Sequence, residues 1–166
     1  MHVYTGKGKG KTTAAIGLAI RAAGAGFKVF FGQFIKGGEY SEIRILAGLD
    51  NITVKQYGRG CFIKEEPTDA DIRAARKGLE EIGEVLKNGK YRLVVMDEAN
   101  IAIYYRLFSV EELLDIVDQR ADHVEVVVTG RMADDSLIAR ADLVTKMEEV
   151  KHYYQQGVTA RRGIEK

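Results

Sequence analysis

Nine consecutive residues near the start of the chain have the types and spacing of a phosphate-binding loop. They run from Thr5 to Thr13 and read T-G-K-G-K-G-K-T-T. Glycines let backbone N–H groups wrap a polyphosphate, and Lys11 would bring a positive charge to its terminal phosphates. The Thr12 hydroxyl can ligate Mg²⁺, and a helix starting here would point the positive end of its dipole at the same anion. The segment predicts a protein that handles a nucleoside triphosphate.

The loop is one residue shorter than the usual G-x-x-x-x-G-K-[ST] pattern. That spacing would require a glycine where the chain has Thr5, and starting from Gly6 leaves only three residues before Gly10. The whole loop is nevertheless a nucleotide-binding candidate. With one lysine from a later loop, the predicted nucleotide-binding residues are Thr5, Gly6, Lys7, Gly8, Lys9, Gly10, Lys11, Thr12, Thr13 and Lys36.

An acidic pair follows a continuous apolar segment farther along the chain. Arg92 to Met96 leads directly into Asp97 and Glu98. A phosphate loop needs a carboxylate at the end of a neighbouring strand to hold Mg²⁺ opposite Thr12, and Asp97 is the first candidate. Glu98 either ligates the metal too or activates a water, as it would in an ATPase. The alternative is a strand-end aspartate that caps the next turn; the phosphate loop upstream favours the metal. The predicted metal ligands are Thr12, Asp97 and Glu98.

Two further cations follow predicted strands. Arg131 comes after V-V-V-T-G and could reach the phosphates, or it could be a solvated arginine in a turn made by Gly130. Lys36 lies in Gln33–Gly38 and could contact phosphate or another acidic group, or it could be solvated in a flexible turn. The two glycines of that segment predict close backbone approach. The catalytic candidates are Lys11, Glu98 and Arg131.

The segment Tyr57 to Ile63 combines glycines, one cation and apolar residues. Such a segment suits a flat, largely apolar ligand with polar edges. Alternatively, this loop places Phe62 and Ile63 in the core. Cys61 is a poor candidate nucleophile, because no histidine is marked as its partner.

Strand and helix patterns alternate along the chain, and they determine where the candidate site residues lie in the fold. Short apolar segments with no polar face predict parallel strands buried on both sides. Apolar residues that recur at three- and four-residue spacing predict helices. Two of these helices open with capping boxes, at Thr68 and at Ser109. The expected strands are His2–Thr5, Lys28–Phe34, Ile52–Tyr57, Arg92–Met96, Val124–Thr129 and Leu143–Met147; other expected helices are Lys11–Ala25, about Ser41–Ala47, and Asp134–Ala141.

This alternation predicts a three-layer α/β P-loop NTPase-like (RecA-like) fold with a mostly parallel central sheet. The ligand would then lie at the carboxyl ends of the strands, where the loop after the first strand also lies. The length of 166 residues indicates one domain spanning residues 1–166.

Composition excludes several classes of protein. A net charge of +1 gives no electrostatic case for nucleic acid or an acidic membrane surface. The single cysteine excludes an internal disulfide, and no apolar segment is long enough to cross a bilayer. We therefore expect a cytoplasmic protein. The three histidines show no metal-ligand spacing, and the basic tail by itself indicates a solvated surface.

The motifs taken together closely resemble the P-loop ATP:cob(I)alamin (corrinoid) adenosyltransferases. The matching segments are T-G-K-G-K-G-K-T-T-A-A-I-G, G-Q-F-I-K-G, the D-E pair, V-V-V-T-G-R and the ending K-H-Y-Y-Q-Q-G-V-T-A-R-R-G-I-E, in that order from residue 4 to residue 165. The short phosphate loop and this ending are specific to that family, whereas the D-E pair is not.

The resemblance implies transfer of the 5′-deoxyadenosyl group of ATP to the Co(I) centre of a reduced corrinoid, with release of triphosphate. It implies that Lys11, Arg131 and the loop backbone carry the phosphate charge and that Mg²⁺ accompanies ATP. By similarity, the loops Gln33–Gly38 and Gly58–Ile63 would face nucleotide and corrinoid. The corrinoid-binding candidates are Gly60, Cys61, Phe62 and Ile63. The implied partners are a reductant or flavoprotein that makes Co(I), and a second copy in a homodimer.

Two departures from the family pattern stand out. Where relatives commonly carry Phe and Trp beside the corrinoid's lower face, this chain has Cys61 and Ile63, with Phe62 between them. Several relatives also carry a segment before the first strand that covers the active site. Here Met1 is already at the strand, so we expect another element to close the site, or the site to stay more open.

Two other functions fit the residues less well. The Asp97–Glu98 pair is also typical of a P-loop ATPase module in a larger assembly. A small-molecule kinase would need an arginine-rich lid, which the sequence does not show. The leaving group distinguishes the three: triphosphate, inorganic phosphate or a phosphorylated acceptor.

Overall fold

The computed structural model describes residues 1–38, 40–60 and 66–165, and within them six strands form one parallel sheet. The strand order is β3-β2-β4-β5-β1-β6, and every neighbouring pair is parallel. All five residues of β2 and of β4 are buried, as expected for central strands covered on both faces. The strands are β1 His2–Thr5, β2 Val29–Gln33, β3 Ile52–Gln56, β4 Leu93–Asp97, β5 Glu125–Thr129 and β6 Leu143–Lys146.

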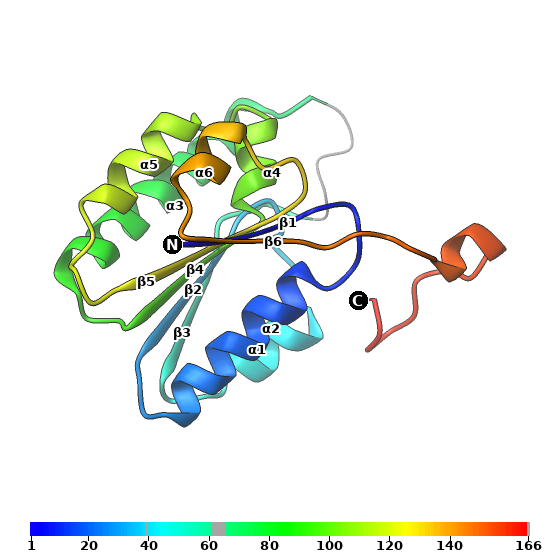
Figure 1. The fold of residues 1–166 in the computed structure, drawn as a ribbon, viewed down its shortest axis with the longest axis horizontal. Helices are drawn as coiled ribbons and strands as arrows, with labels where there is room; N and C mark the ends of the chain where they lie inside the picture. Colours follow the sequence, from blue (N-terminus) through cyan, green and yellow to red (C-terminus); the bar gives the residue numbers. More distant parts are fainter. Residues whose placement is uncertain (39, 61–65, 166) are drawn as a thin grey trace.

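Helices cover both faces of this sheet, which gives the predicted three layers (Figure 1). On one face lie α1 and α2; on the other lie α3, α4, α5 and α6. None of the described helices is both long and apolar enough to cross a bilayer. The helices are α1 Lys11–Gly24, α2 Ser41–Ala47, α3 Asp69–Asn88, α4 Ala99–Tyr104, α5 Val110–Asp118 and α6 Asp135–Arg140, followed by a 3₁₀ helix, η1, at Tyr153–Gln156.

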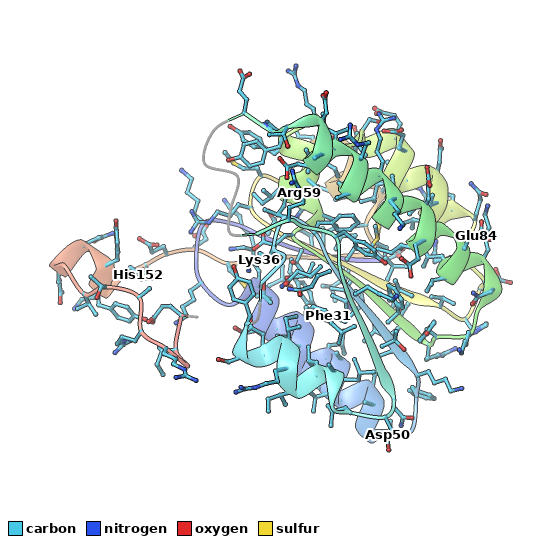
Figure 2. All side chains as sticks on the ribbon, turned by 180° about the vertical axis from the view of Figure 1, so that it is seen from behind. Phe31, Lys36, Asp50, Arg59, Glu84 and His152 are labelled. Atoms are coloured by element: carbon cyan, nitrogen blue, oxygen red, sulfur yellow. The ribbon has the colours of Figure 1, made fainter. Side chains whose placement is uncertain are left out.

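Two separate apolar cores hold the layers together. The small side chains of Ala15 and Ala19 on α1 are fully buried and pack with Phe31 of β2 and Val95 of β4. The larger core lies under α3 and α5 on the opposite face. Figure 2 shows Phe31 within the sheet, with Lys36 and Asp50 toward its opposite ends.

The two predicted capping boxes are confirmed, and one helix was not predicted. Thr68 and Asp71 exchange hydrogen bonds at the start of α3, as Ser109 and Glu112 do at the start of α5. The missed helix is α4. It has only six residues, too few to show a helical period in sequence.

The loops after β2 and β3 lie side by side, and this requires glycine. Lys36 and Gly60 form an isolated parallel bridge, and the Gly37 N–H donates to the Gly60 carbonyl at 2.9 Å. A Cβ on Gly37 would lie 2.1 Å from the carbonyl oxygen of Gly58. The predicted close approach is confirmed at Gly37. At Gly38 the nearest atom of the described residues to an added Cβ is a side-chain carbon at 3.6 Å, so close approach there stays a prediction.

We expect Gly58→Ala to destabilise the protein because its new Cβ would lie 2.2 Å from the backbone of Ile35. Overpacking of this kind costs about 1–3 kcal/mol. Gly17→Ala is the matched control, since a Cβ there has no atom within 4 Å. In an exposed helix position this change stabilises by about 0.5–1 kcal/mol. Denaturant unfolding of both variants measures the difference. Equal stability would contradict the close approach of the two loops.

Candidate active site

An open cleft of about 1780 Å³ lies at the carboxyl ends of the strands. This is the edge of the sheet at which the sequence predicted a ligand. The cleft is larger than the 300–1,000 Å³ typical of small-molecule sites. Among the predicted site residues, its lining contains Thr5, Gly6, Lys7, Gly8, Lys9, Gly10, Lys11, Thr12, Thr13, Lys36, Glu98 and Arg131.

The other predicted site residues have different positions. Asp97 is fully buried beneath the cleft and contacts the lining residue Thr12. Gly60 pairs with Lys36 but does not line the cleft. Cys61, Phe62 and Ile63 lie outside the described residues.

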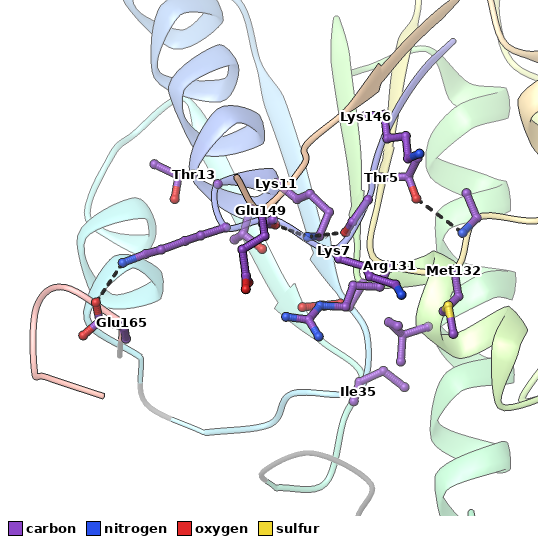
Figure 3. Close-up of a pocket in the computed structure, with 18 of the residues that line it drawn as sticks. Thr5, Lys7, Lys11, Thr13, Ile35, Arg131, Met132, Lys146, Glu149 and Glu165 are labelled. Carbon is purple, nitrogen blue, oxygen red and sulfur yellow. Dashed lines mark hydrogen bonds and ion pairs between the residues drawn. The ribbon is translucent and has the colours of Figure 1, made fainter. Parts of the chain in front are cut away.

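The phosphate loop leads from β1 into α1, and its lysine is folded back on it. Gly6 and Gly10 have φ of 99° and 114°, values that favour glycine. The ammonium of Lys11 donates to the carbonyls of Gly6 at 2.8 Å and Gly8 at 2.6 Å. Burial, and then the nearby charge of Arg131, lower the pKa of Lys11. The loop thus holds the positive charge of Lys11 at its centre, where it can attract a bound anion (Figure 3).

The same glycines also pack against the segment that follows β6. The Gly8 N–H donates to the Met147 carbonyl at 2.8 Å, and the Met147 N–H donates to the Thr5 carbonyl at 2.8 Å. A Cβ on Gly6 would lie 2.3 Å from the Met147 oxygen. The glycines therefore serve the fold of the loop as well as any ligand, which the sequence pattern alone did not reveal.

Asp97 is held by donors from three elements. Its carboxylate accepts from Thr12 of α1 at 2.9 Å, Gln33 of β2 at 2.9 Å and Thr129 of β5 at 2.6 Å. Its carbonyl accepts from the N–H of Phe34 at 2.9 Å. The sequence identified Asp97 and Thr12, but missed Gln33 and Thr129 as partners. Their only signal was a polar residue at the end of an otherwise apolar strand.

Glu98 and Lys36 form an ion pair beside this network. Their charged atoms lie 3.2 Å apart, and both side chains are largely buried. Burial and the charge of Asp97 raise the pKa of Glu98. Burial disfavours the Lys36 charge, but Glu98 and Asp97 outweigh it and raise the pKa of Lys36. Of the alternatives for Lys36, contact with an acidic group is confirmed and a solvated side chain is wrong.

Arg131 enters the cleft from the turn after β5. Gly130 has φ of 134°, and the buried Asn100 of α4 donates to its carbonyl at 3.0 Å. This bond fixes the turn that presents Arg131. Asn100 was another residue that sequence reasoning missed, because α4 was not predicted.

The side of the cleft formed by α4, α6 and the turn after β5 is apolar. We call Ile101, Tyr104, Tyr105, Met132 and Ile138 the apolar wall. Tyr104 is 55% exposed and Met132 is 52% exposed, although both are large apolar residues. Met132 has φ of 57°, and Ile35, which lies beside the wall in Figure 3, has φ of 66°. Such strained backbone persists where the surrounding structure imposes it, and it often marks functional sites.

The residues predicted to bind Mg²⁺ have suitable chemistry. The Thr12 hydroxyl lies 2.9 Å from an Asp97 carboxylate oxygen, and Glu98 follows directly in the chain. No group of three His, Cys, Asp or Glu side chains that could hold a metal occurs in the described residues. Mg²⁺ bound with a nucleotide usually takes one or two carboxylates, phosphate oxygens and water. The oxygen donors here fit that arrangement.

A glycine-rich loop between β1 and α1, with an aspartate at the end of a nearby parallel strand, defines a P-loop nucleotide-binding protein. A family model described as "ATP:corrinoid adenosyltransferase BtuR/CobO/CobP" matches residues 1–165. The chain belongs to this family of enzymes. The resemblance inferred from the motifs is thereby confirmed, as is the predicted P-loop fold.

Individual corrinoid adenosyltransferases are similar to nearly the whole chain. A corrinoid adenosyltransferase from Sinorhizobium sp is 36% identical over 167 residues, which cover 98% of this chain and 78% of that protein. One from Pseudomonas aeruginosa is 35% identical, with 98% and 81% covered. The protein named corrinoid adenosyltransferase CobA from Salmonella typhimurium is 33% identical, with 98% and 83% covered.

We expect Thr129→Val to destabilise the protein, because it removes one of the three side-chain donors to the buried Asp97 carboxylate. Leaving a buried polar group unsatisfied costs about 1–3 kcal/mol. The same change at Thr145, on β6, whose residues are all exposed, should alter the free energy of unfolding by less than about 0.5 kcal/mol. Denaturant titrations of both variants provide the measurement. Similar values would show that Asp97 does not depend on Thr129.

Proposed function

We propose that this enzyme transfers the 5′-deoxyadenosyl group of ATP to the Co(I) centre of a reduced corrinoid and releases inorganic triphosphate. The product would enter adenosylcobalamin biosynthesis or salvage. The observation that carries the proposal is a single cleft with a phosphate loop at one side and the apolar wall at another. A polyanion and a large, mostly apolar ring can both be accommodated there.

The proposed step balances without a general base. The electron pair of Co(I) forms a bond to the ribose C5′, while the C5′–O bond breaks and its electron pair leaves on the triphosphate. No proton has to be removed. The protein's main tasks are therefore to align the two reactants, exclude water and stabilise the developing charge of the leaving group.

The cations of the cleft suit that last task. Lys11 and Arg131 lie close enough that the arginine charge lowers the pKa of the lysine. The repulsion between two like charges brought together in this way is relieved when a polyanion binds between them. We assign leaving-group stabilisation to Lys11, Arg131 and the N–H groups of Gly6 to Lys11, apart from the Gly8 N–H, which donates to Met147. Lys36 would contribute to this stabilisation through its contact with Glu98.

We propose that Thr12, Asp97 and Glu98 hold the Mg²⁺ that accompanies ATP. The bound ion would supply further neutralisation of phosphate charge. The burial of Asp97 and its three side-chain donors keep that carboxylate in place without help from the ligand.

The apolar wall supports the corrinoid side of the proposal. Exposed Tyr104 and Met132 offer flat and polarisable surfaces to a macrocycle. We also keep Gly60, Cys61, Phe62 and Ile63 as proposed corrinoid contacts, since Gly60 lies next to Lys36 at the rim of the cleft.

Further proposals concern the cellular setting. We propose that residues 1–166 work as one adenosyltransferase domain in the cytoplasm, as a homodimer. A separate reductant or flavoprotein would supply the electron that converts Co(II) to Co(I), because the proposed step starts from Co(I).

The function is tested under anaerobic conditions with MgATP and chemically reduced cobalamin. We expect the Co(I) absorbance to be lost, with a light-sensitive alkylcobalamin and triphosphate appearing in equal amounts. An unchanged corrinoid with inorganic phosphate released would overturn the proposal in favour of an ATPase.

Lys11→Ala should lower adenosyl transfer by at least about 100-fold, in the range seen when one charge-stabilising group is removed. The side chain lies at the cleft and, among the described residues, its ammonium donates only to loop carbonyls, so the fold should remain. Lys28→Ala, an exposed lysine just before β2, serves as the control and should keep full activity. Single-turnover rates give the comparison. Retained transfer in Lys11→Ala would remove the phosphate loop from the mechanism.

Glu98→Gln should raise the Mg²⁺ concentration needed for half-maximal turnover by about 10-fold or more. Asp134→Asn is the matched control: Asp134 caps α6 by accepting from the Ser136 N–H at 2.8 Å, and asparagine can do the same. Turnover measured against Mg²⁺ concentration distinguishes the two variants. If both respond alike, Glu98 does not act through the metal.

A further inference from the structure

The end of the chain folds back toward the phosphate loop. We call residues 151–165 the C-terminal strap. After β6 the chain leaves the sheet, makes the 3₁₀ helix η1, and turns back at Gly157, which has φ of 82° (Figure 1). The strap therefore approaches Lys9, which precedes it by more than 140 residues in the sequence.

The strap is not held by an apolar core. None of its described residues is buried, and Tyr154 and Ile164 are 73% and 56% exposed. A segment of this kind depends on polar contacts for its position. It can therefore open at little cost compared with elements of the core.

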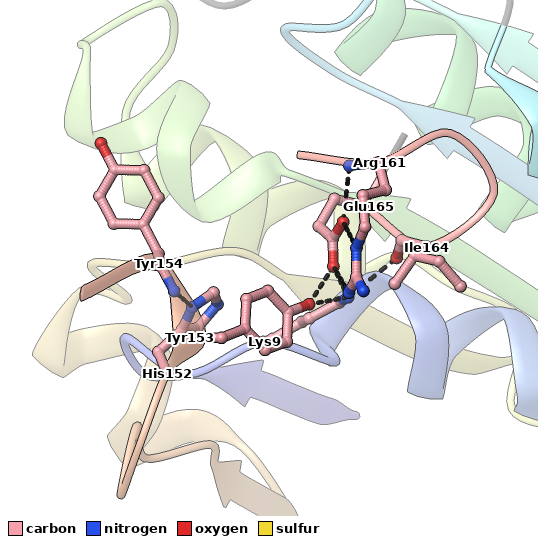
Figure 4. Close-up of polar contacts among 7 residues, drawn as sticks. All are labelled: Lys9, His152, Tyr153, Tyr154, Arg161, Ile164 and Glu165. Atoms are coloured by element: carbon pink, nitrogen blue, oxygen red, sulfur yellow. Dashed lines mark hydrogen bonds and ion pairs between the residues drawn. The ribbon is translucent and has the colours of Figure 1, made fainter. Parts of the chain in front are cut away.

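Lys9 makes the contacts that join the strap to the phosphate loop (Figure 4). Its ammonium donates to the Ile164 carbonyl at 2.8 Å, to a Glu165 carboxylate oxygen at 3.0 Å and to the Tyr153 hydroxyl at 3.4 Å. Three acceptors from the two ends of the strap thus meet one side chain of the loop.

Glu165 is the centre of this cluster. Besides Lys9, it accepts from the backbone N–H of Arg161 at 2.7 Å, from the Arg161 guanidinium at 3.2 Å, and from the Tyr153 hydroxyl. The Arg161 guanidinium also stacks on the Tyr153 ring, 4.8 Å from its centre. The bonds from Arg161 and Tyr153 lower the pKa of the Glu165 carboxyl.

The strap also forms part of the cleft. His152, Gly163, Ile164 and Glu165 line the same cavity as Lys11 and Thr12. From these contacts we infer that Glu165 is a positioning residue. By holding Lys9, it fastens the strap across the open side of the cleft and encloses the part of the nucleotide that lies outside the phosphate loop.

The inference rests on the proposed use of ATP and adds a residue to it. If the closed strap contacts the nucleotide, then binding ATP must stabilise the closed strap, and the closed strap must strengthen ATP binding by the same factor. The first effect can be measured with MgATP alone, without any corrinoid.

The test combines hydrogen exchange of the strap with steady-state kinetics. In the wild-type protein, MgATP should slow amide exchange in residues 151–165 by about 5-fold or more. Glu165→Ala should abolish this protection and raise the KM for ATP by a similar factor, with little change in kcat or in the KM for corrinoid. Glu165→Gln, which keeps a hydrogen-bond acceptor but no charge, should give intermediate values.

Arg162→Gln is the matched control: it changes a charge in the strap at an exposed residue beside the cluster, and it should behave as wild type. An ATP KM unchanged in Glu165→Ala, or strap exchange indifferent to MgATP in the wild type, would overturn the inference. Strap protection by MgATP in a protein that forms no alkylcobalamin would instead support the inference and reject the proposed function.

Discussion

The structure of the site depends on keeping one carboxylate buried. Asp97 is fully shielded from solvent, where an unsatisfied charge would be very costly. It is tolerated because Thr12, Gln33 and Thr129 donate to it from α1, β2 and β5. The same bonds tie the start of the nucleotide helix to two strands of the sheet. Asp97 thus links the fold to the site, and Lys11 and Lys36 lie near enough for its charge to act on both.

Around this carboxylate the cleft separates its charged and apolar surfaces. Lys11 and Arg131 lie on the side of the phosphate loop, whereas Tyr104 and Met132 are exposed on the apolar wall. Adenosyl transfer from ATP to a corrinoid would need both environments in one cleft, because the cobalt must reach the ribose carbon that carries the triphosphate. Met132 and Ile35 have left-handed backbone conformations, which indicates that the surrounding structure holds the backbone at the rim of the cleft in place.

The glycines of the phosphate loop have two physical roles at once. Their lack of a side chain lets Met147 approach Gly6 and Gly8, and the Gly8 N–H donates to the Met147 carbonyl. The other backbone N–H groups of the loop would serve a bound anion. The segment that carries Met147 continues into the C-terminal strap. Through it, and through Lys9, the loop is connected on two sides to the end of the chain.

The sequence by itself determined the parallel sheet, the order of most elements, both capping boxes and the phosphate loop with Asp97, because each depends on local residue types and periodicity. Tertiary structure alone decided which polar side chains are hydrogen-bond partners in the site. Gln33 and Thr129 showed only as polar strand ends, because their bonds to Asp97 depend on strand register and order. Asn100, on α4, gave no sign of its contact with Gly130. The six residues of α4 were too few to show a period. The tail, whose composition indicated only a solvated surface, lines the cleft because Glu165 meets a lysine at the other end of the chain. Such long-range pairings follow from how the chain is folded, and no local pattern encodes them.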